Sequence, residues 1–252
     1  MRAANLPSIL PVAVAFAVLA TACNQGEAIR KQALADSEAV TFTTSDGLEL
    51  AGRIFGPHGA TAGVVLAHML PADQSSWFEF ADRLGGLGYR ALTFDFRGYC
   101  PGGMAGCSQG SKDVSAIGSD VRAAARYLKS QGVRRIGLVG ASMGGTASLV
   151  VASRPDKTID AVITLSAPDT IDGLAAGPNV IQAITAAKLF IAGNGDDVAA
   201  RSAEAFYQQS TTPKRVEILT TSDHGTDLLE GNQAEIARTL IIGWLTQYVP
   251  VS

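Results

Sequence analysis

The chain has 252 residues, of which 47% are hydrophobic and 17% are charged, and its formal net charge is -3. This composition is that of a globular protein and excludes a disordered or fibrous chain, while the weak negative charge gives no indication of a nucleic-acid partner. The length suits one sizeable domain with a buried core.

Residues 1–22 have the pattern of a signal peptide. Arg2 supplies a positive start, and the uncharged apolar run at 9–20 is too short for an ordinary spanning helix. The segment "LATAC", ending at Cys23, resembles a bacterial lipobox, in which the cysteine is lipidated and becomes the mature N-terminus. Cleavage by an ordinary signal peptidase, which would release a soluble secreted protein, is the alternative. We expect an exported protein of the bacterial cell envelope, anchored in the membrane through Cys23, with residues 23–37 as a polar tether.

Eight strand-like runs follow. The first two, at 39–44 and 48–55, are separated by Ser-Asp-Gly and predict an antiparallel hairpin, because Asp-Gly favours a tight turn. The other six are continuous apolar runs, as expected for strands covered on both faces. These six occupy residues 62–69, 90–96, 135–140, 160–167, 188–193 and 215–221.

Helical periodicity lies between the strand-like runs. Residues 75–88 and 112–132 each carry one apolar stripe, and the closing helix has Ile236, Leu240 and Trp244 on one face. A hairpin followed by repeated β–α units predicts an α/β domain with a doubly wound, mostly parallel eight-stranded sheet. We place this domain at residues 38–252.

One serine lies between glycines at a predicted strand-to-helix junction, in "IGLVGASMGGTASLV". The Gly-x-Ser-x-Gly pattern around Ser142 is a weak signal by itself. Small neighbours such as Gly140 and Gly144 nevertheless suit the strained turn that exposes a nucleophilic serine. The helix N-terminus beneath Ser142 would also favour developing negative charge.

A serine hydroxyl needs a base that removes its proton, and the chain has three histidines. We expect His58, in a loop before the third strand, at the surface, whereas His68 ends that strand. His224 follows the eighth strand and is the expected base. Asp196 and Asp197 follow the seventh strand, where one carboxylate can orient the imidazole and the other can cap the next helix.

The segments "LAHMLPADQSSW", "DFRGYC", "GASMGG", "AGNGDD" and "SDHG" occur in the order found in α/β-hydrolase-fold serine hydrolases. The chain resembles that family over about residues 38–249, and in outline it is similar to the dienelactone-hydrolase-like and small esterase branches. The resemblance implies Ser142 as nucleophile, Asp196 as acid and His224 as base. The family often inserts a lid between strands six and seven, but here residues 169–187 have room for one short helix and no cap domain.

The resemblance also implies two backbone N–H groups, from Leu70 and Met143, that stabilise an oxyanion. Met69 stands where the family usually has glycine, so the first donor is either Met69 or Leu70. His68 would then support the oxyanion loop. The family's Gly-x-x-Asp turn selects Asp196 over its neighbour.

Two cysteines lie close together in the glycine-rich loop "GYCPGGMAGCSQG". In an oxidising compartment a disulfide between Cys100 and Cys107 is favoured over two free thiols. A zinc site would need more cysteine or histidine ligands nearby.

These patterns predict a serine hydrolase that cleaves a small-molecule carboxylic ester through an acyl-enzyme. No metal or organic cofactor is implied, because the nucleophile, the base and the electrophilic groups all belong to the protein. An acyltransferase with the same triad and a non-catalytic, membrane-tethered binding lipoprotein are the alternatives.

Overall fold

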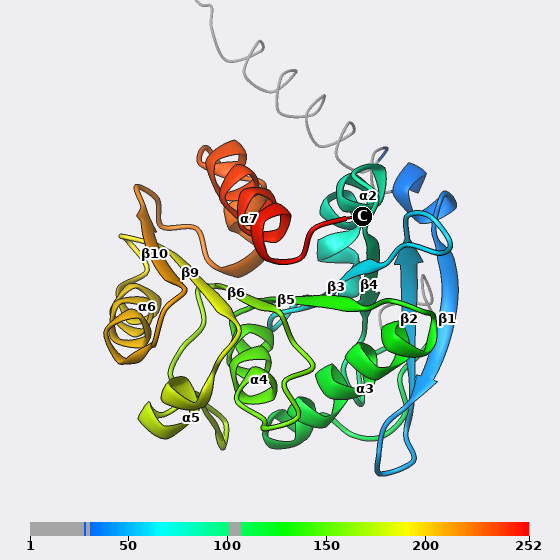
Figure 1. The fold of residues 1–252 in the computed structure, drawn as a ribbon, viewed down its shortest axis with the longest axis horizontal. Helices are drawn as coiled ribbons and strands as arrows, with labels where there is room; N and C mark the ends of the chain where they lie inside the picture. The colour runs from blue at the N-terminus through cyan, green and yellow to red at the C-terminus, as the bar shows by residue number, and fades with distance from the viewer. Residues whose placement is uncertain (1–27, 29–30, 101–106, 252) are drawn as a thin grey trace, which may run out of the picture.

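The computed structural model describes residues 28, 31–100 and 107–251. Its centre is an eight-stranded sheet in the order β1-β2-β4-β3-β5-β6-β9-β10 (Figure 1). β1 and β2 form the predicted antiparallel hairpin, β2 also runs antiparallel to β4, and all other neighbours are parallel. The predicted α/β fold class is therefore confirmed. The strands are β1 (Glu38–Thr43), β2 (Glu49–Phe55), β3 (Ala62–Ala67), β4 (Arg90–Phe94), β5 (Arg135–Ala141), β6 (Ala161–Leu165), β7 (Thr170–Ile171), β8 (Leu174–Ala175), β9 (Ala187–Gly193) and β10 (Lys214–Leu219).

Helices cover both faces of the sheet. In Figure 1, α2 and α7 lie on one face, and α3, α4, α5 and α6 lie on the other. Each helical layer packs against its face of the sheet in a separate hydrophobic core. The helices are η1 (Gln74–Trp77), α2 (Phe78–Gly86), η2 (Val114–Ala116), α3 (Ile117–Ser130), α4 (Met143–Ala152), α5 (Pro178–Ala183), α6 (Asp197–Gln209), η3 (Gly225–Leu229) and α7 (Ala234–Tyr248). Within the described ranges, no helix has the length and apolar character needed to cross a membrane.

The last helix buries only part of the face expected, because Trp244 is 8% exposed and Leu240 packs on the core but Ile236 does not. Ile236 is 51% exposed, whereas Ile241 and Leu245 are fully buried. A side chain at Gly137 of β5 would collide with Leu245, so the glycine lets this leucine pack directly on the sheet. The side of the helix that carries Ile241 and Leu245 therefore faces the sheet.

The packed structure begins earlier in the chain than expected. Residues 31–35 are helical, and Ala33 is 2% exposed in the same core as α2 and α7. The Arg53 guanidinium donates to the Ser37 hydroxyl at 2.6 Å and to the Leu34 carbonyl at 3.2 Å. The prediction of a tether that extends to residue 37 is therefore wrong, because its second half packs on the domain.

The predicted signal segment 1–22 and Cys23 lie outside the described residues.

The segment between β6 and β9 contains a hairpin that was not predicted. β7 and β8 pair antiparallel around Asp172 and Gly173, whose φ angles are 44° and 83°. A tight two-residue hairpin turn of this type requires positive φ at both central residues, and Asp-Gly is a pair that adopts it readily. The hairpin tip lies beside Ser115 of η2, since a Cβ at Gly173 would be 3.4 Å from that side chain. Only this hairpin and the predicted short helix, α5, occupy the place of a lid, so no separate cap domain is present.

The strand order determines where the functional loops meet. From β3 the chain passes to β4 on one side and then crosses to β5 on the other. In open α/β sheets, ligands bind at the carboxyl ends of the strands where the order reverses in this way. The loops after β3, β4 and β5 therefore lie at one edge of the sheet, at the reversal of the strand order.

Candidate active site

Ser142 occupies a strained turn between β5 and α4. Its φ and ψ are 47° and -117°, and only 7% of its surface is exposed. A positive φ is uncommon for a residue with a side chain and persists only where the surroundings impose it. Here the Ser142 N–H donates to the Leu165 carbonyl of the neighbouring β6 at 2.8 Å. The structure thus places the predicted nucleophile on a sharp turn at the carboxyl edge of the sheet.

The glycines around Ser142 are required by close backbone packing. A Cβ at Gly140 would collide with the Gly144 carbonyl. A Cβ at Gly144 would in turn lie 2.6 Å from the His68 carbonyl and would also collide with that of Ala67. These contacts press the first turn of α4 against the loop that follows β3.

The predicted acid and base lie together at the neighbouring strand ends. His224 Nδ1 is 2.6 Å from Asp196 Oδ2, and the two side chains are 42% and 15% exposed. Because Nδ1 faces the carboxylate, Nε2 is the ring nitrogen left to serve Ser142. Within the described residues no hydrogen bond joins the Ser142 hydroxyl to the His224 ring. Such bonds often tighten only when substrate binds.

The His224 loop nevertheless lies against the strand that carries Ser142. A Cβ at Gly225, the residue after the histidine, would lie 3.4 Å from the Ala141 side chain, the residue before the serine. The 3-10 helix η3 packs against β5, β6 and β9. The nucleophile turn and the histidine loop are therefore in contact.

The other candidate carboxylates lie elsewhere. Asp197 is exposed in the first turn of α6, and Asp169 is exposed after β6. The Asp223 carboxylate lies against the backbone of Gly231. Of these acids, only Asp196 contacts the His224 ring.

His68 is buried and held in one tautomer. Its Nε2 accepts from the Phe96 N–H at 3.2 Å, so the ring proton is on Nδ1, which donates to the Met69 carbonyl at 2.9 Å. The rings of Phe96 and Tyr99 pack on the imidazole at centroid distances of 4.6 and 4.8 Å. Burial lowers the pKa of His68 to about 4. The ring is therefore neutral at pH 7 and holds the start of the loop that follows β3.

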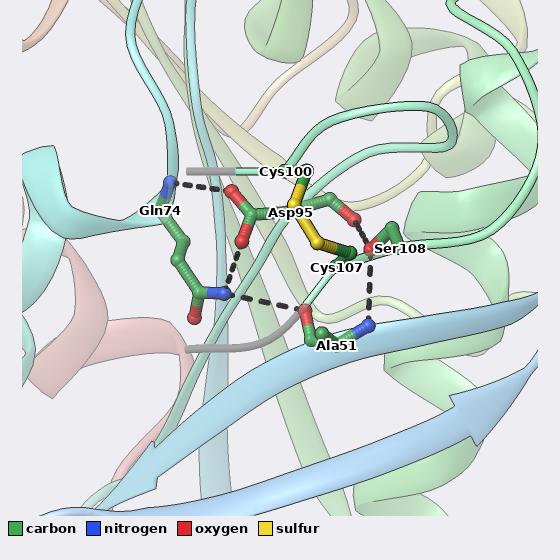
Figure 2. Close-up of a disulfide and its surroundings, with 6 residues drawn as sticks. All are labelled: Ala51, Gln74, Asp95, Cys100, Cys107 and Ser108. Carbon is green, nitrogen blue, oxygen red and sulfur yellow. Dashed lines mark hydrogen bonds between the residues drawn. A yellow bond between two sulfur atoms is a disulfide. The ribbon is translucent and has the colours of Figure 1, made fainter. Parts of the chain in front are cut away.

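The far end of that loop is held by a second buried polar group, which the sequence did not reveal. The Gln74 N–H donates to Asp95 Oδ1 at 3.0 Å, and the Gln74 side-chain amide donates to Asp95 Oδ2 and to the Ala51 carbonyl (Figure 2). The Thr93 hydroxyl donates to Gln74 Oε1 at 3.1 Å. Burial raises the pKa of the Asp95 carboxyl to about 7, although the Gln74 donors oppose that rise.

The loop after β4 is closed at its base. The structure joins Cys100 and Cys107 by a disulfide (Figure 2), and the Ser108 N–H donates to the Tyr99 carbonyl at 3.0 Å. These two contacts hold residues 99–100 beside residues 107–108. The intervening residues 101–106 lie outside the described ranges.

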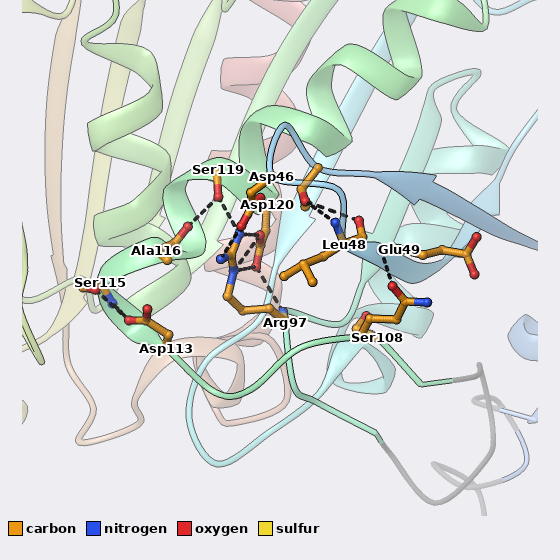
Figure 3. Close-up of polar contacts among 12 residues, drawn as sticks. Asp46, Leu48, Glu49, Arg97, Ser108, Asp113, Ser115, Ala116, Ser119 and Asp120 are labelled. Atoms are coloured by element: carbon orange, nitrogen blue, oxygen red, sulfur yellow. Dashed lines mark hydrogen bonds and ion pairs between the residues drawn. The ribbon is translucent and has the colours of Figure 1, made fainter.

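A buried arginine anchors the same loop from the other side. Arg97 donates to Asp120 at 2.7 Å, to Asp46 at 3.0 Å and to the Ser119 hydroxyl at 2.6 Å (Figure 3). The hydrogen bonds to Asp120 raise the pKa of Arg97, so the guanidinium stays charged. This cluster fastens the loop after β4 to α3 and to the β1–β2 turn. The segment "DFRGYC" contains Arg97, but its distant partners could not be identified from the sequence.

The two predicted oxyanion donors lie directly after Ser142 and in the loop that follows β3. Met143 is the first residue of α4, and Leu70 follows the peptide carbonyl that His68 holds. In the described part of the chain, neither the Leu70 N–H nor the Met143 N–H donates to a protein acceptor. His58, in contrast, is a surface residue with an 85% exposed side chain. No group of three or more metal-ligating side chains occurs among the described residues.

Comparison with known proteins gives a consistent result for the fold. A family model described as alpha/beta hydrolase fold matches residues 63–234. An uncharacterized protein of Mycobacterium tuberculosis is 29% identical over 219 residues, which cover 76% of this chain and 74% of that protein. An esterase of Pyrococcus furiosus aligns with a TM-score of 0.71 at 19% identity, over 84% of this chain and 91% of the esterase. A dienelactone hydrolase of Anabaena variabilis aligns with a TM-score of 0.68 at 21% identity, over 84% of this chain and 98% of that enzyme.

Proposed function

The chain belongs to the alpha/beta hydrolase fold family, and from that premise we propose that it is a serine hydrolase that cleaves carboxylic esters. The proposal is carried by the strained φ of 47° at Ser142, on the same sheet edge as the His224–Asp196 pair at 2.6 Å. Backbone strain of this kind occurs most often at functional sites, where it exposes a reactive side chain.

The reaction begins when the Ser142 hydroxyl attacks the ester carbonyl carbon. His224 Nε2 takes the hydroxyl proton and later gives it to the departing alcohol, which leaves an acyl group on Ser142. Water then attacks the acyl-enzyme with His224 again as base, and the acid product departs. Asp196 keeps the ring oriented and stabilises its cationic form.

We propose Leu70, and not Met69, as the first oxyanion donor. The Met69 carbonyl points to the His68 ring, and in a trans peptide the N–H of the next residue points the opposite way. The Leu70 N–H is therefore turned away from the buried imidazole, and no acceptor for it occurs among the described residues. Met143 supplies the second donor at the N-terminus of α4, where the helix dipole also favours negative charge.

The substrate we propose is a small-molecule ester. The similar solved structures are described as an esterase and a dienelactone hydrolase, and both names denote ester cleavage. The segment after β6 contains one hairpin and one short helix, so the site has no cap domain that would bury a long substrate.

A fluorophosphonate probe tests this proposal directly, because it reacts only with an activated serine. We expect stoichiometric labelling of Ser142 and hydrolysis of nitrophenyl esters. The dependence of the hydrolysis rate on acyl length would indicate the size of the acyl pocket. Ser142→Ala should abolish labelling and lower kcat by about 10⁶. A folded wild-type protein that neither labels nor hydrolyses any ester of the series would refute the proposal.

We also propose that the enzyme is exported and anchored in the bacterial cell envelope by lipid on Cys23. The apolar run that ends in "LATAC" supports this. Mass spectrometry of the mature protein from a bacterial host should find a diacylated or triacylated N-terminal Cys23. An unmodified N-terminus at Cys23 or beyond would instead support a soluble secreted enzyme.

A further inference from the structure

A buried serine outside the proposed triad begins a continuous path of hydrogen bonds. Ser108 is 6% exposed, and its hydroxyl donates to the Asp95 carbonyl at 2.6 Å (Figure 2). The same oxygen accepts from the Ala51 N–H of β2 at 3.0 Å. Both bonds fix the direction of the hydroxyl proton towards Asp95.

The second step crosses one peptide group and one ring. The peptide that begins with the Asp95 carbonyl ends with the Phe96 N–H, which donates to His68 Nε2 at 3.2 Å. The opposite ring nitrogen, Nδ1, donates to the Met69 carbonyl at 2.9 Å. Each group in this path accepts at one end and donates at the other, so the dipoles are aligned and polarise one another.

The third step reaches the proposed oxyanion donor. The Met69 carbonyl and the Leu70 N–H belong to one planar peptide, so holding the carbonyl also fixes the direction of the N–H. Polarisation along the path also strengthens that N–H as a donor.

We propose that Ser108 is a positioning residue for ester hydrolysis, which acts through the Asp95–Phe96 peptide and the His68 ring to aim the Leu70 N–H at the oxyanion. This inference rests on the proposed function. Ser108 directly follows Cys107, so the path starts beside the disulfide. One continuous series of hydrogen bonds thereby joins Ser108 to the loop that follows β3.

A matched pair of alanine variants separates this role from ordinary support of the fold. Ser108→Ala removes one hydroxyl that donates to a carbonyl and accepts from an N–H. Ser37→Ala removes a hydroxyl with the same two roles, since Ser37 Oγ donates to the Leu34 carbonyl at 2.7 Å and accepts from Arg53 Nε at 2.6 Å. Ser37 precedes β1 at the far edge of the sheet, away from Ser142.

The kinetic readout is kcat for each fluorophosphonate-titrated site. Because a small misplacement of a catalytic group can cost about 10²-fold, we expect Ser108→Ala to lower kcat by about tenfold to 10²-fold. KM should stay within about threefold, and the affinity for a trifluoromethyl ketone, which places an oxyanion in the site, should fall in parallel with kcat/KM. Ser37→Ala should leave all three unchanged. Equal kcat in the two variants would overturn the proposal.

A second readout does not depend on activity. In nitrogen-15 NMR, wild-type His68 should carry its proton on Nδ1, and the resonance of that proton should shift in Ser108→Ala but not in Ser37→Ala. A proton on Nε2, or an unchanged His68 signal in Ser108→Ala, would overturn the path. A shifted signal in a protein without hydrolase activity would support the path and refute the proposed reaction.

Discussion

The two sides of the candidate site differ in how they meet water. On the side formed by the loops after β3 and β4, His68 and Asp95 are fully buried. The hydrogen bonds from Ser108 to His68 lie inside the domain. On the side formed by the loops after β5, β9 and β10, the His224 side chain is 42% exposed and its partner Asp196 is 15% exposed. Both sides carry a histidine and an aspartate at the carboxyl edge of one sheet.

This difference separates two tasks. Burial lowers the pKa of His68 to about 4, so this ring is neutral at pH 7, and its hydrogen bonds to Phe96 and Met69 hold it in one tautomer. His224 keeps access to water and has a carboxylate that stabilises its charged form, which are the needs of a group that takes and returns a proton. The buried side therefore provides position, and the exposed side provides proton transfer.

The largest loss of activity should follow removal of the carboxylate on the exposed side. Asp196→Asn replaces the carboxylate whose oxygen lies 2.6 Å from His224 Nδ1. The amide no longer favours the His224 tautomer in which Nε2 is unprotonated. We expect kcat to fall by about 10⁴. Steady-state kinetics with a nitrophenyl ester, normalised to folded protein, measures this loss. An active Asp196→Asn beside an inactive Asp169→Asn or Asp223→Asn would show that a different acid serves the histidine.

The buried side is probed by the pH dependence of stability. The folded protein holds His68 neutral down to about pH 4, whereas an unfolded histidine binds a proton below its ordinary pKa of 6.5. His68 therefore contributes stability that is present above pH 6.5 and lost as the pH falls to 4, about 3 kcal/mol in all. The contribution of Asp95 depends on pH in the opposite direction. Its pKa rises from 3.8 to about 7 on folding, so the stability that it contributes to the fold is lost as the pH rises through that interval.

Between pH 4 and 6.5, His68 and Asp95 change the free energy of unfolding in opposite directions, and a variant of either residue should reveal the contribution of the other. His68→Gln keeps one donor and one acceptor but cannot titrate, so the free energy of unfolding should decrease with rising pH. In Asp95→Asn it should increase over the same interval. Denaturant titrations across this range measure both, and slopes of the same sign in the two variants would contradict the assignment.

The parts predicted from the sequence are those with a local signature. Apolar runs located the eight strands of the main sheet, and the glycines around Ser142 predicted its turn because tight backbone packing excludes side chains there. The Ser108 and Gln74 contacts could not be predicted, because Ala51 and Ser108 are 57 residues apart and meet only after the sheet has formed. The β7–β8 hairpin was missed although Asp172 and Gly173 carry the signal that identified the first hairpin. Its two-residue strands were too short to show alternation.

The disulfide on the buried side should affect stability more than activity. Replacing Cys100 and Cys107 together by serine should lower the free energy of unfolding by about 2.5 kcal/mol, as expected for a loop this short. We expect kcat to change less than tenfold, because the Ser108 hydroxyl keeps its own bonds to Ala51 of β2 and to Asp95, the residue after β4. Thiol titration of denatured, unreduced protein should find no free sulfhydryl at these positions. Two reactive thiols in exported protein would contradict the bridge.

The smallest effect should come from the neighbour of the proposed acid. Asp197 is exposed in the first turn of α6, and among the described residues the carboxylate that contacts the His224 ring is that of Asp196. A carboxylate in the first turn of a helix contributes about 0.3–1 kcal/mol through the helix dipole, so Asp197→Asn should lower stability by no more than this. Its kcat should change less than tenfold, in contrast to the loss in Asp196→Asn. Similar kcat losses in the two variants would mean that the negative charge near His224, and not the single oriented contact, supports the reaction.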